Sequence, residues 1–119
     1  MFADPQTVTI NAIANTLPRT QAGVDAGIFS KDDGNVKLSA KHTYANRIRR
    51  LARLDIRKVA ADPLTTGYNK EYNMSAYLVI DHPPVGFTNA ELKLQIDGLV
   101  AWLSASTGAN ITKLLGGES

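Results

Sequence analysis

The chain has 119 residues, of which 44% are hydrophobic and 20% charged, with a formal net charge of +2. This length fits a single domain, 1–119, but so short a chain leaves much of its surface exposed, and we therefore expect association with a second copy. The absence of cysteine excludes disulfides, thiolate metal sites and cysteine nucleophiles, and only two histidines, His42 and His82, leave little for a histidine-based metal site. No apolar run is as long as a membrane span, and the start Met-Phe-Ala-Asp-Pro lacks the parts of a signal peptide, so a soluble, unexported protein is expected.

The positive charge is concentrated in one stretch of the chain. Residues 36–58 hold eight basic residues against Asp55 alone, whereas the remainder has five basic and ten acidic residues. Clustered Lys and Arg attract nucleic acid because they release counterions from phosphates. The stretch is therefore a candidate nucleic-acid surface, and a solvated charged surface is the alternative.

The N-terminal part of the sequence predicts a hairpin over 6–20. Apolar and polar residues alternate over 6–13, which is typical of a half-buried strand. Residues 15–23 are rich in turn formers, although 16–19 can return as a short edge strand.

An antiparallel meander is predicted over 27–80. A strand at 27–31 ends at an Asp-Asp-Gly-Asn turn, and 36–43 alternates apolar with basic and polar residues. The same alternation returns over 72–80, where Asn73, Ser75 and Tyr77 share one side.

Residues 46–59 fit two secondary structures. As a strand, the segment places Arg49, Arg53 and Arg57 on an outer face, with Arg50 misplaced on the apolar inner face. As a helix over 44–59, it would be the basic amphipathic helix of a dimeric nucleic-acid-binding module. Periodicity does not decide between them.

The C-terminal third predicts a break followed by two helices. Asp81 and His82 precede two prolines and are assigned to a loop rather than to an acid–base pair. Thr88-Asn89-Ala90-Glu91 is a capping box for a helix to about Ser106, and Asn110 is the predicted cap of a second helix over 111–115. The apolar stripe of the first helix consists of Leu92, Ile96, Leu99, Val100 and Leu103.

Catalytic signatures are missing from the sequence. It contains no Gly-rich phosphate loop, metal motif or hydrolase elbow, so we expect no enzyme, cofactor or metal site, with a small enzyme of unknown chemistry as the remaining alternative. His42 is expected to be a half-buried histidine. Tyr68, Tyr72 and Tyr77 are candidates to stack on a base.

The order of hairpin, basic meander, loop, last strand and two helices resembles the coat proteins of single-stranded RNA bacteriophages, the levivirus family. The resemblance covers nearly the whole chain. It is carried by residues 36–41, by the run 53–59, and by 72–80 leading to 88–92.

The resemblance implies an α+β fold in which two chains form one continuous antiparallel sheet with the helices on one face. It implies a non-enzymatic capsid protein that is located in the virion, binds genomic RNA and represses translation at a hairpin.

The resemblance also assigns roles to segments of the chain: 46–59 is expected to be a strand, and the loop 61–68 is expected to be an assembly loop. The assembly-loop residues are Asp62, Pro63, Leu64, Thr65, Thr66 and Gly67. The residues expected to bind RNA are Lys37, Ser39, Lys41, Arg49, Arg53, Asn73, Ser75 and Tyr77. The helix residues expected in the dimer core are Leu92, Ile96, Leu99, Val100 and Leu103. Lys37 and Leu51 depart from the family, because they replace small hydroxyl residues that line adenine pockets.

Overall fold

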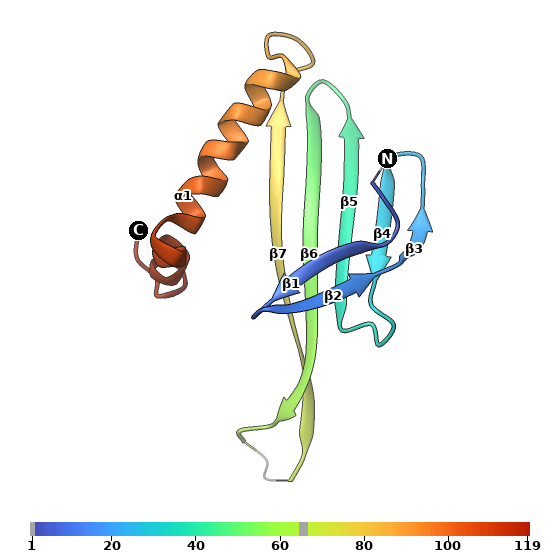
Figure 1. Ribbon diagram of the computed structural model, residues 1–119, viewed down its shortest axis with the longest axis vertical. Helices are drawn as coiled ribbons and strands as arrows, with labels where there is room; N and C mark the ends of the chain where they lie inside the picture. Colours follow the sequence, from blue (N-terminus) through green and yellow to red (C-terminus); the bar gives the residue numbers. More distant parts are fainter. Residues whose placement is uncertain (1, 65–66) are drawn as a thin grey trace. The chain divides into compact units, whose positions relative to one another are not determined.

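The computed structural model describes residues 2–64 and 67–119, so Thr65 and Thr66 of the predicted assembly loop lie outside the described residues. The fold contains seven antiparallel strands, in a two-stranded and a five-stranded sheet, and one C-terminal helical element (Figure 1). Its contacts divide the chain into two units, one ending at His82 and the other spanning Pro83–Ser119. Each unit is described separately.

The larger sheet is a meander in which each strand pairs with the next along the chain, in the order β3-β4-β5-β6-β7. The strands are β3 (Arg19–Ala22), β4 (Ala26–Ser30), β5 (Val36–Tyr44), β6 (Ile48–Ala61) and β7 (Asn69–His82). The predicted meander is present, and the basic segment is the strand β6. The alternative of a basic helix over 44–59 is therefore wrong.

The register of β5, β6 and β7 gives the sheet two chemically different faces. Ser39 pairs with Arg53, and Arg53 pairs in turn with Tyr77, so these three residues lie on one face. We call it the basic face. The other face, here called the apolar face, carries residues such as Leu38, which pairs with Leu54.

The N-terminal hairpin forms, but its turn lies earlier than the sequence predicts. β1 (Gln6–Ile10) pairs with β2 (Ile13–Leu17) through a two-residue turn at Asn11 and Ala12, whose φ angles of 50° and 62° are left-handed. Residues 6–13 are therefore not one strand, and Asn15 lies inside β2 rather than in a turn. The turn was missed because the apolar alternation runs straight through it and no glycine marks it.

Two further strand boundaries differ from the prediction. Pro18 lies between β2 and β3 rather than inside an edge strand at 16–19. β7 continues through Asp81 and His82, which were predicted to belong to a loop, and Asp81 pairs with Arg49. The strand reaches the prolines because a residue that precedes proline favours extended backbone.

The main core cluster lies between the hairpin and the apolar face. Leu17 from β2, Phe29 from β4 and Val36 from β5 are buried together, with Val8 and Leu54 among the partly buried residues packed against them. The hairpin therefore covers part of the apolar face. Ala76 and Met74 of β7 remain exposed in the single chain.

Arg50 lies on the apolar face, as the strand interpretation required. Its guanidinium lies 3.1 Å from Nδ1 of half-buried His42, donates to the Tyr44 hydroxyl at 3.5 Å, and lies 5.7 Å from the centre of the Tyr44 ring. These neighbours satisfy the arginine without an acidic partner.

The second unit contains one helical element, α1 (Asn89–Leu115), which is interrupted by non-helical backbone at Ala105–Gly108, close to the predicted end of the first helix at Ser106. Thr88 caps its start, because its hydroxyl accepts a hydrogen bond from the Glu91 backbone at 3.2 Å. A kink at Ala105–Gly108 has non-helical backbone angles. Asn110 does not cap a second helix; its side chain donates to the Trp102 carbonyl at 2.7 Å and so spans the kink.

α1, all of which is described, contains no buried residue. Among the predicted stripe residues, the exposed fractions of Leu99 and Val100 are 42% and 49%. Within 2–64 and 67–119, no helix is long and apolar enough to cross a membrane.

The core cluster predicts which leucine the fold needs. Replacing fully buried Leu17 by Ala should lower the free energy of unfolding by about 2–5 kcal/mol, because a cavity replaces packed methyl groups. Leu64→Ala, at a side chain that is 93% exposed, is the matched control and should change stability little. Denaturant unfolding monitored by circular dichroism measures both variants. Equal losses for the two would contradict this assignment of the core.

Candidate nucleic-acid interface

Three neighbouring strands bring the predicted RNA-binding residues to the basic face. Lys37, Ser39 and Lys41 come from β5, and Arg49 and Arg53 come from β6. β7 contributes Asn73, Ser75 and Tyr77, opposite Arg57, Asp55 and Arg53 respectively. Arg53 and Ser75, which are 22 positions apart in the chain, become neighbours because each strand pairs in register with the next.

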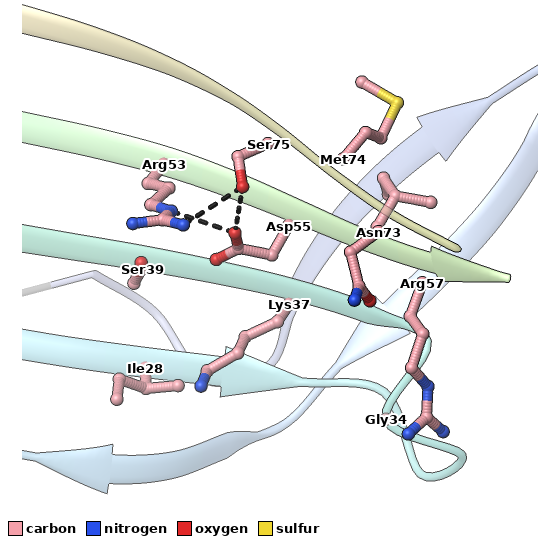
Figure 2. Close-up of a pocket in the computed structure, with 11 residues that line it drawn as sticks. Ile28, Gly34, Lys37, Ser39, Arg53, Asp55, Arg57, Asn73, Met74 and Ser75 are labelled. Atoms are coloured by element: carbon pink, nitrogen blue, oxygen red, sulfur yellow. Dashed lines mark hydrogen bonds and ion pairs between the residues drawn. The ribbon is translucent and has the colours of Figure 1, made fainter. Parts of the chain in front are cut away.

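The centre of the basic face is a hydrogen-bonded cluster of three side chains (Figure 2). Arg53 donates from Nε to Oδ1 of Asp55 at 2.9 Å and from a terminal nitrogen to the Ser75 hydroxyl at 3.0 Å. The Ser75 hydroxyl donates to the same Oδ1 at 2.7 Å. Arg53 is thus partly engaged by an acid of the protein itself.

This cluster keeps Asp55 charged. The hydrogen bond from Ser75 is the main cause that lowers the pKa of Asp55, and the hydrogen bond and charge of Arg53 and the charge of Lys37 lower it further. Burial opposes the shift. Asp55 is therefore a fixed negative charge at the centre of the basic face at neutral pH.

An aromatic ring lies beside the cluster. The Arg53 guanidinium carbon lies 5.9 Å from the centre of the Tyr77 ring, which is a cation–π arrangement. Tyr77 is 65% exposed, so most of its surface remains accessible. Of the other two candidate tyrosines, Tyr72 lies on the apolar face opposite Lys58, and Tyr68 follows the loop.

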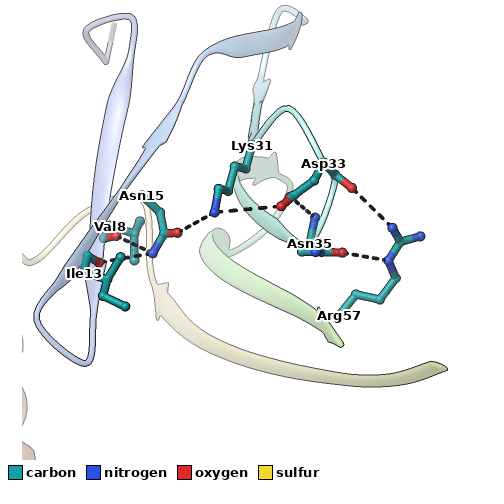
Figure 3. Close-up of polar contacts among 7 residues, drawn as sticks. All are labelled: Val8, Ile13, Asn15, Lys31, Asp33, Asn35 and Arg57. Carbon is teal, nitrogen blue, oxygen red and sulfur yellow. Dashed lines mark hydrogen bonds and ion pairs between the residues drawn. The ribbon is translucent and has the colours of Figure 1, made fainter. Parts of the chain in front are cut away.

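The basic side chains differ in how many hydrogen bonds and ion pairs they already form within the protein. Lys41 and Arg49 make no hydrogen bond or ion pair with any residue that the structure describes. Arg57 instead belongs to a polar chain at the end of the sheet (Figure 3). Its Nε donates to Asn35 Oδ1 at 3.2 Å, and a terminal nitrogen donates to the Asp33 carbonyl at 3.3 Å.

The polar chain continues from the turn to the hairpin. Lys31 lies 3.8 Å from Asp33 and donates to the side chain of buried Asn15 at 3.1 Å. The amide of Asn15 donates in turn to the carbonyls of Val8 and Ile13. Arg57 therefore has a structural role, which fits its omission from the predicted RNA-binding set.

The basic face is hollowed in two adjoining places. A depression of about 550 Å³ is lined by Lys37, Ser39, Asp55, Asn73 and further residues, and a smaller one of about 370 Å³ is lined by Leu51, Arg53, Ser75 and Tyr77. Arg53 and Ser75 line both. No group of three His, Asp or Glu side chains suited to a metal ion occurs in the described part of the chain.

Sequence reasoning missed the central role of Asp55. It was visible only as the single acid in a basic segment, and no local pattern indicated that Ser75, 20 residues away, would donate to it. Among the remaining predicted site residues, Leu99 and Val100 of the helix stripe are exposed in the single chain, and Leu92, Ile96 and Leu103 are partly buried. In the assembly loop, Asp62 Oδ1 accepts a hydrogen bond from the Leu64 backbone at 2.9 Å.

Solved structures share this fold over most of their length. A virus-like particle of bacteriophage AVE019 has a TM-score of 0.78 at 13% identity, covering 89% of this chain and 90% of that chain. The bacteriophage EMS014 coat protein has a TM-score of 0.70 at 16% identity, covering 92% and 80%. A virus-like particle of Beihai levi-like virus 21 has a TM-score of 0.70 at 10% identity, covering 97% and 94%.

No protein-family model matches this sequence, and no curated protein matches it significantly. At 10–16% identity, the structural likeness establishes the fold. The predicted resemblance to single-stranded RNA phage coat proteins is confirmed at that level: the chain has their fold.

The hydrogen bond from Ser75 makes stability depend on pH in a defined direction. A carboxylate whose pKa is lowered on folding stabilises the fold above its unfolded pKa of about 3.9, and this contribution disappears as pH falls through the folded pKa. Ser75→Ala should therefore melt a few degrees below the unmodified protein at pH 7, and the difference should shrink at pH 3.

Ser39→Ala is the control for this experiment, because Ser39 is a serine of the same face without a hydrogen bond to a described residue. Thermal melts at both pH values test the pair. A deficit in Ser75→Ala that persists unchanged at pH 3 would mean that the serine stabilises the sheet without acting on the Asp55 charge.

Proposed function

We propose that this protein is the coat protein of a single-stranded RNA phage, a non-enzymatic structural protein that assembles through dimers into a closed icosahedral shell and resides in the virion. The observation that carries the proposal is the shared fold, which extends over about nine-tenths of this chain and of the AVE019 particle protein. A likeness over a whole chain is informative here because it includes the hairpin, the meander and the helix together.

Three surfaces that remain unpaired or incompletely covered in the single chain support dimerisation. β7 pairs with β6 only among the described strands, so a 14-residue edge of the sheet remains open. α1 exposes Leu99 and Val100 of its apolar stripe, and the apolar face is only partly covered by the hairpin. A second copy that extends the sheet at β7 and places its helix on the apolar face would satisfy all three surfaces.

The basic face supports RNA binding. Lys41 and Arg49 are positive and unengaged by described residues, which suits contact with phosphates. Ser39 and Asn73 offer neutral donors and acceptors beside them, as contacts to bases require. We infer that this face binds genomic RNA inside the shell and that the same face binds a hairpin in translational repression.

The loop after β6 is proposed to serve assembly rather than folding. Its described residues Asp62, Pro63, Leu64 and Gly67 contribute nothing to the core cluster. In a shell, such a loop would contact neighbouring dimers.

Electron microscopy of the expressed protein tests the shell directly, and closed particles are the expected result. Leu99→Asp should abolish particles and leave aggregated or unfolded protein, because it places an unpaired charge in the proposed dimer core. Leu94→Asp is the control: its side chain is 69% exposed and lies opposite the stripe on the helix, so particles should persist. A folded, monodisperse monomer of the unmodified protein in light scattering would refute the dimer.

RNA binding is tested by the salt dependence of affinity. The double variant Lys41→Ala with Arg49→Ala should bind all RNAs more weakly and flatten the slope of log affinity against log salt by roughly 1.4, at about 0.7 for each lost contact with single-stranded RNA. Lys58→Ala with Lys70→Ala removes the same charge from the apolar face and should leave the slope nearly unchanged. If both double variants lower the slope equally, the effect comes from net charge and not from the basic face.

A further inference from the structure

We propose that Asp55 is a specificity-determining residue, which keeps RNA phosphates away from the centre of the basic face and accepts a hydrogen bond from the donor edge of an unpaired base, guanine above all. The proposal rests on the RNA binding proposed above. It divides the face into an outer part for the RNA backbone and a central part for a base.

The geometry leaves Asp55 with an open acceptor. Arg53 and Ser75 both donate to Oδ1, and no described residue donates to Oδ2. An ionised carboxylate has about four acceptor positions over its two oxygens, so about half of this capacity, at Oδ2, is unused. Figure 2 shows Asp55 between Arg53 and Lys37, among the residues that line the larger depression.

The charge at this position disfavours a phosphate. Asp55 is anionic and repels a phosphate group, while the arginine beside it already donates to that carboxylate at 2.9 Å. Lys41 and Arg49 form no ion pair or side-chain hydrogen bond with a described residue, since Asp81 opposite Arg49 is paired with Arg47, and both remain available to the backbone. A base edge that carries N–H groups satisfies a carboxylate without this repulsion.

The adjoining depression offers a surface on which a base can stack. It is lined by Leu51, Arg53, Ser75 and Tyr77, and the Arg53 guanidinium is held over the tyrosine ring. Unpaired bases stack on aromatic rings and on guanidinium planes. Because the two depressions share Arg53 and Ser75, a base stacked beside Tyr77 borders the carboxylate of Asp55.

The hydrogen-bond donors that each base presents determine how strongly it should bind the Asp55 carboxylate. Guanine presents an imino N–H and an amino group side by side, so it brings two adjacent donors to the open acceptor positions of Oδ2. Adenine and cytosine each present one amino group next to a ring acceptor. Uracil presents one N–H between two carbonyl oxygens, which the carboxylate repels. The preference should therefore be strongest between guanine and uracil.

The test uses nucleic-acid-free protein and two unstructured RNA 12-mers, one all uridine and one with a single central guanosine. The unmodified protein should bind the guanosine oligomer roughly tenfold more tightly, as is typical of one good base contact. Asp55→Asn should bind the all-uridine oligomer more tightly and lose most of that preference. Inosine in place of guanosine removes the amino group and should lower the preference of the unmodified protein, a measurement that does not depend on whether the variant folds.

Asp81→Asn is the matched control, because Asp81 lies on the same face, forms an ion pair with Arg47 at 3.0 Å and lines neither depression. It removes the same charge and should keep the preference for guanosine. Equal affinity of the unmodified protein for the two oligomers, or an undiminished preference in Asp55→Asn, would overturn the proposal while leaving RNA binding intact. Failure of all three proteins to bind either oligomer at low salt would instead remove the proposed RNA binding itself.

Discussion

The pairing of β6 with both of its neighbours is the constraint on which the rest of the structure depends. Fourteen residues of β6 are in register with β7, and nine of β5 are in register with β6, so side chains from three strands alternate between the faces together. A shift of one residue would move Arg49 and Arg53 onto the apolar face and Leu54 onto the basic face. The charge separation of the molecule is thus a consequence of strand register.

The two faces of the sheet are then stabilised differently, the apolar face by burial and the basic face by hydrogen bonds between side chains. On the apolar face, the hairpin buries one region around Leu17 and Phe29, while Met74 and Ala76 of β7 stay exposed. On the basic face, Asp55 and Ser75 hold Arg53, and the polar chain through Asn35 holds Arg57. Lys41 and Arg49 keep their full capacity for external anions. The basic side chains of this face therefore differ in how free they are to bind an external anion, and the net charge of the face does not reveal that difference.

Sequence alternation was sufficient to predict β5, most of β7 and the side on which each of their residues lies. It left β6 undecided, because a row of apolar residues at mixed spacing fits both a strand and a helix, and pairing on both sides selects the strand. The hairpin turn at Asn11 and Ala12 carries no local signal, since alternation passes through it. Asp55 shows the same limit for the site: its partner Ser75 becomes a neighbour only through strand pairing.

The open edge of β7 also affects what happens to a chain before it finds a partner. Its 14 residues present a row of backbone donors and acceptors that any extended peptide can join, and the strand is broken by no proline before Pro83. A newly made chain is therefore prone to aggregate through this edge for as long as it is alone. Because correct pairing with a second copy and aggregation both require collisions between chains, a higher concentration speeds both, and the outcome depends on which contact at this edge forms first.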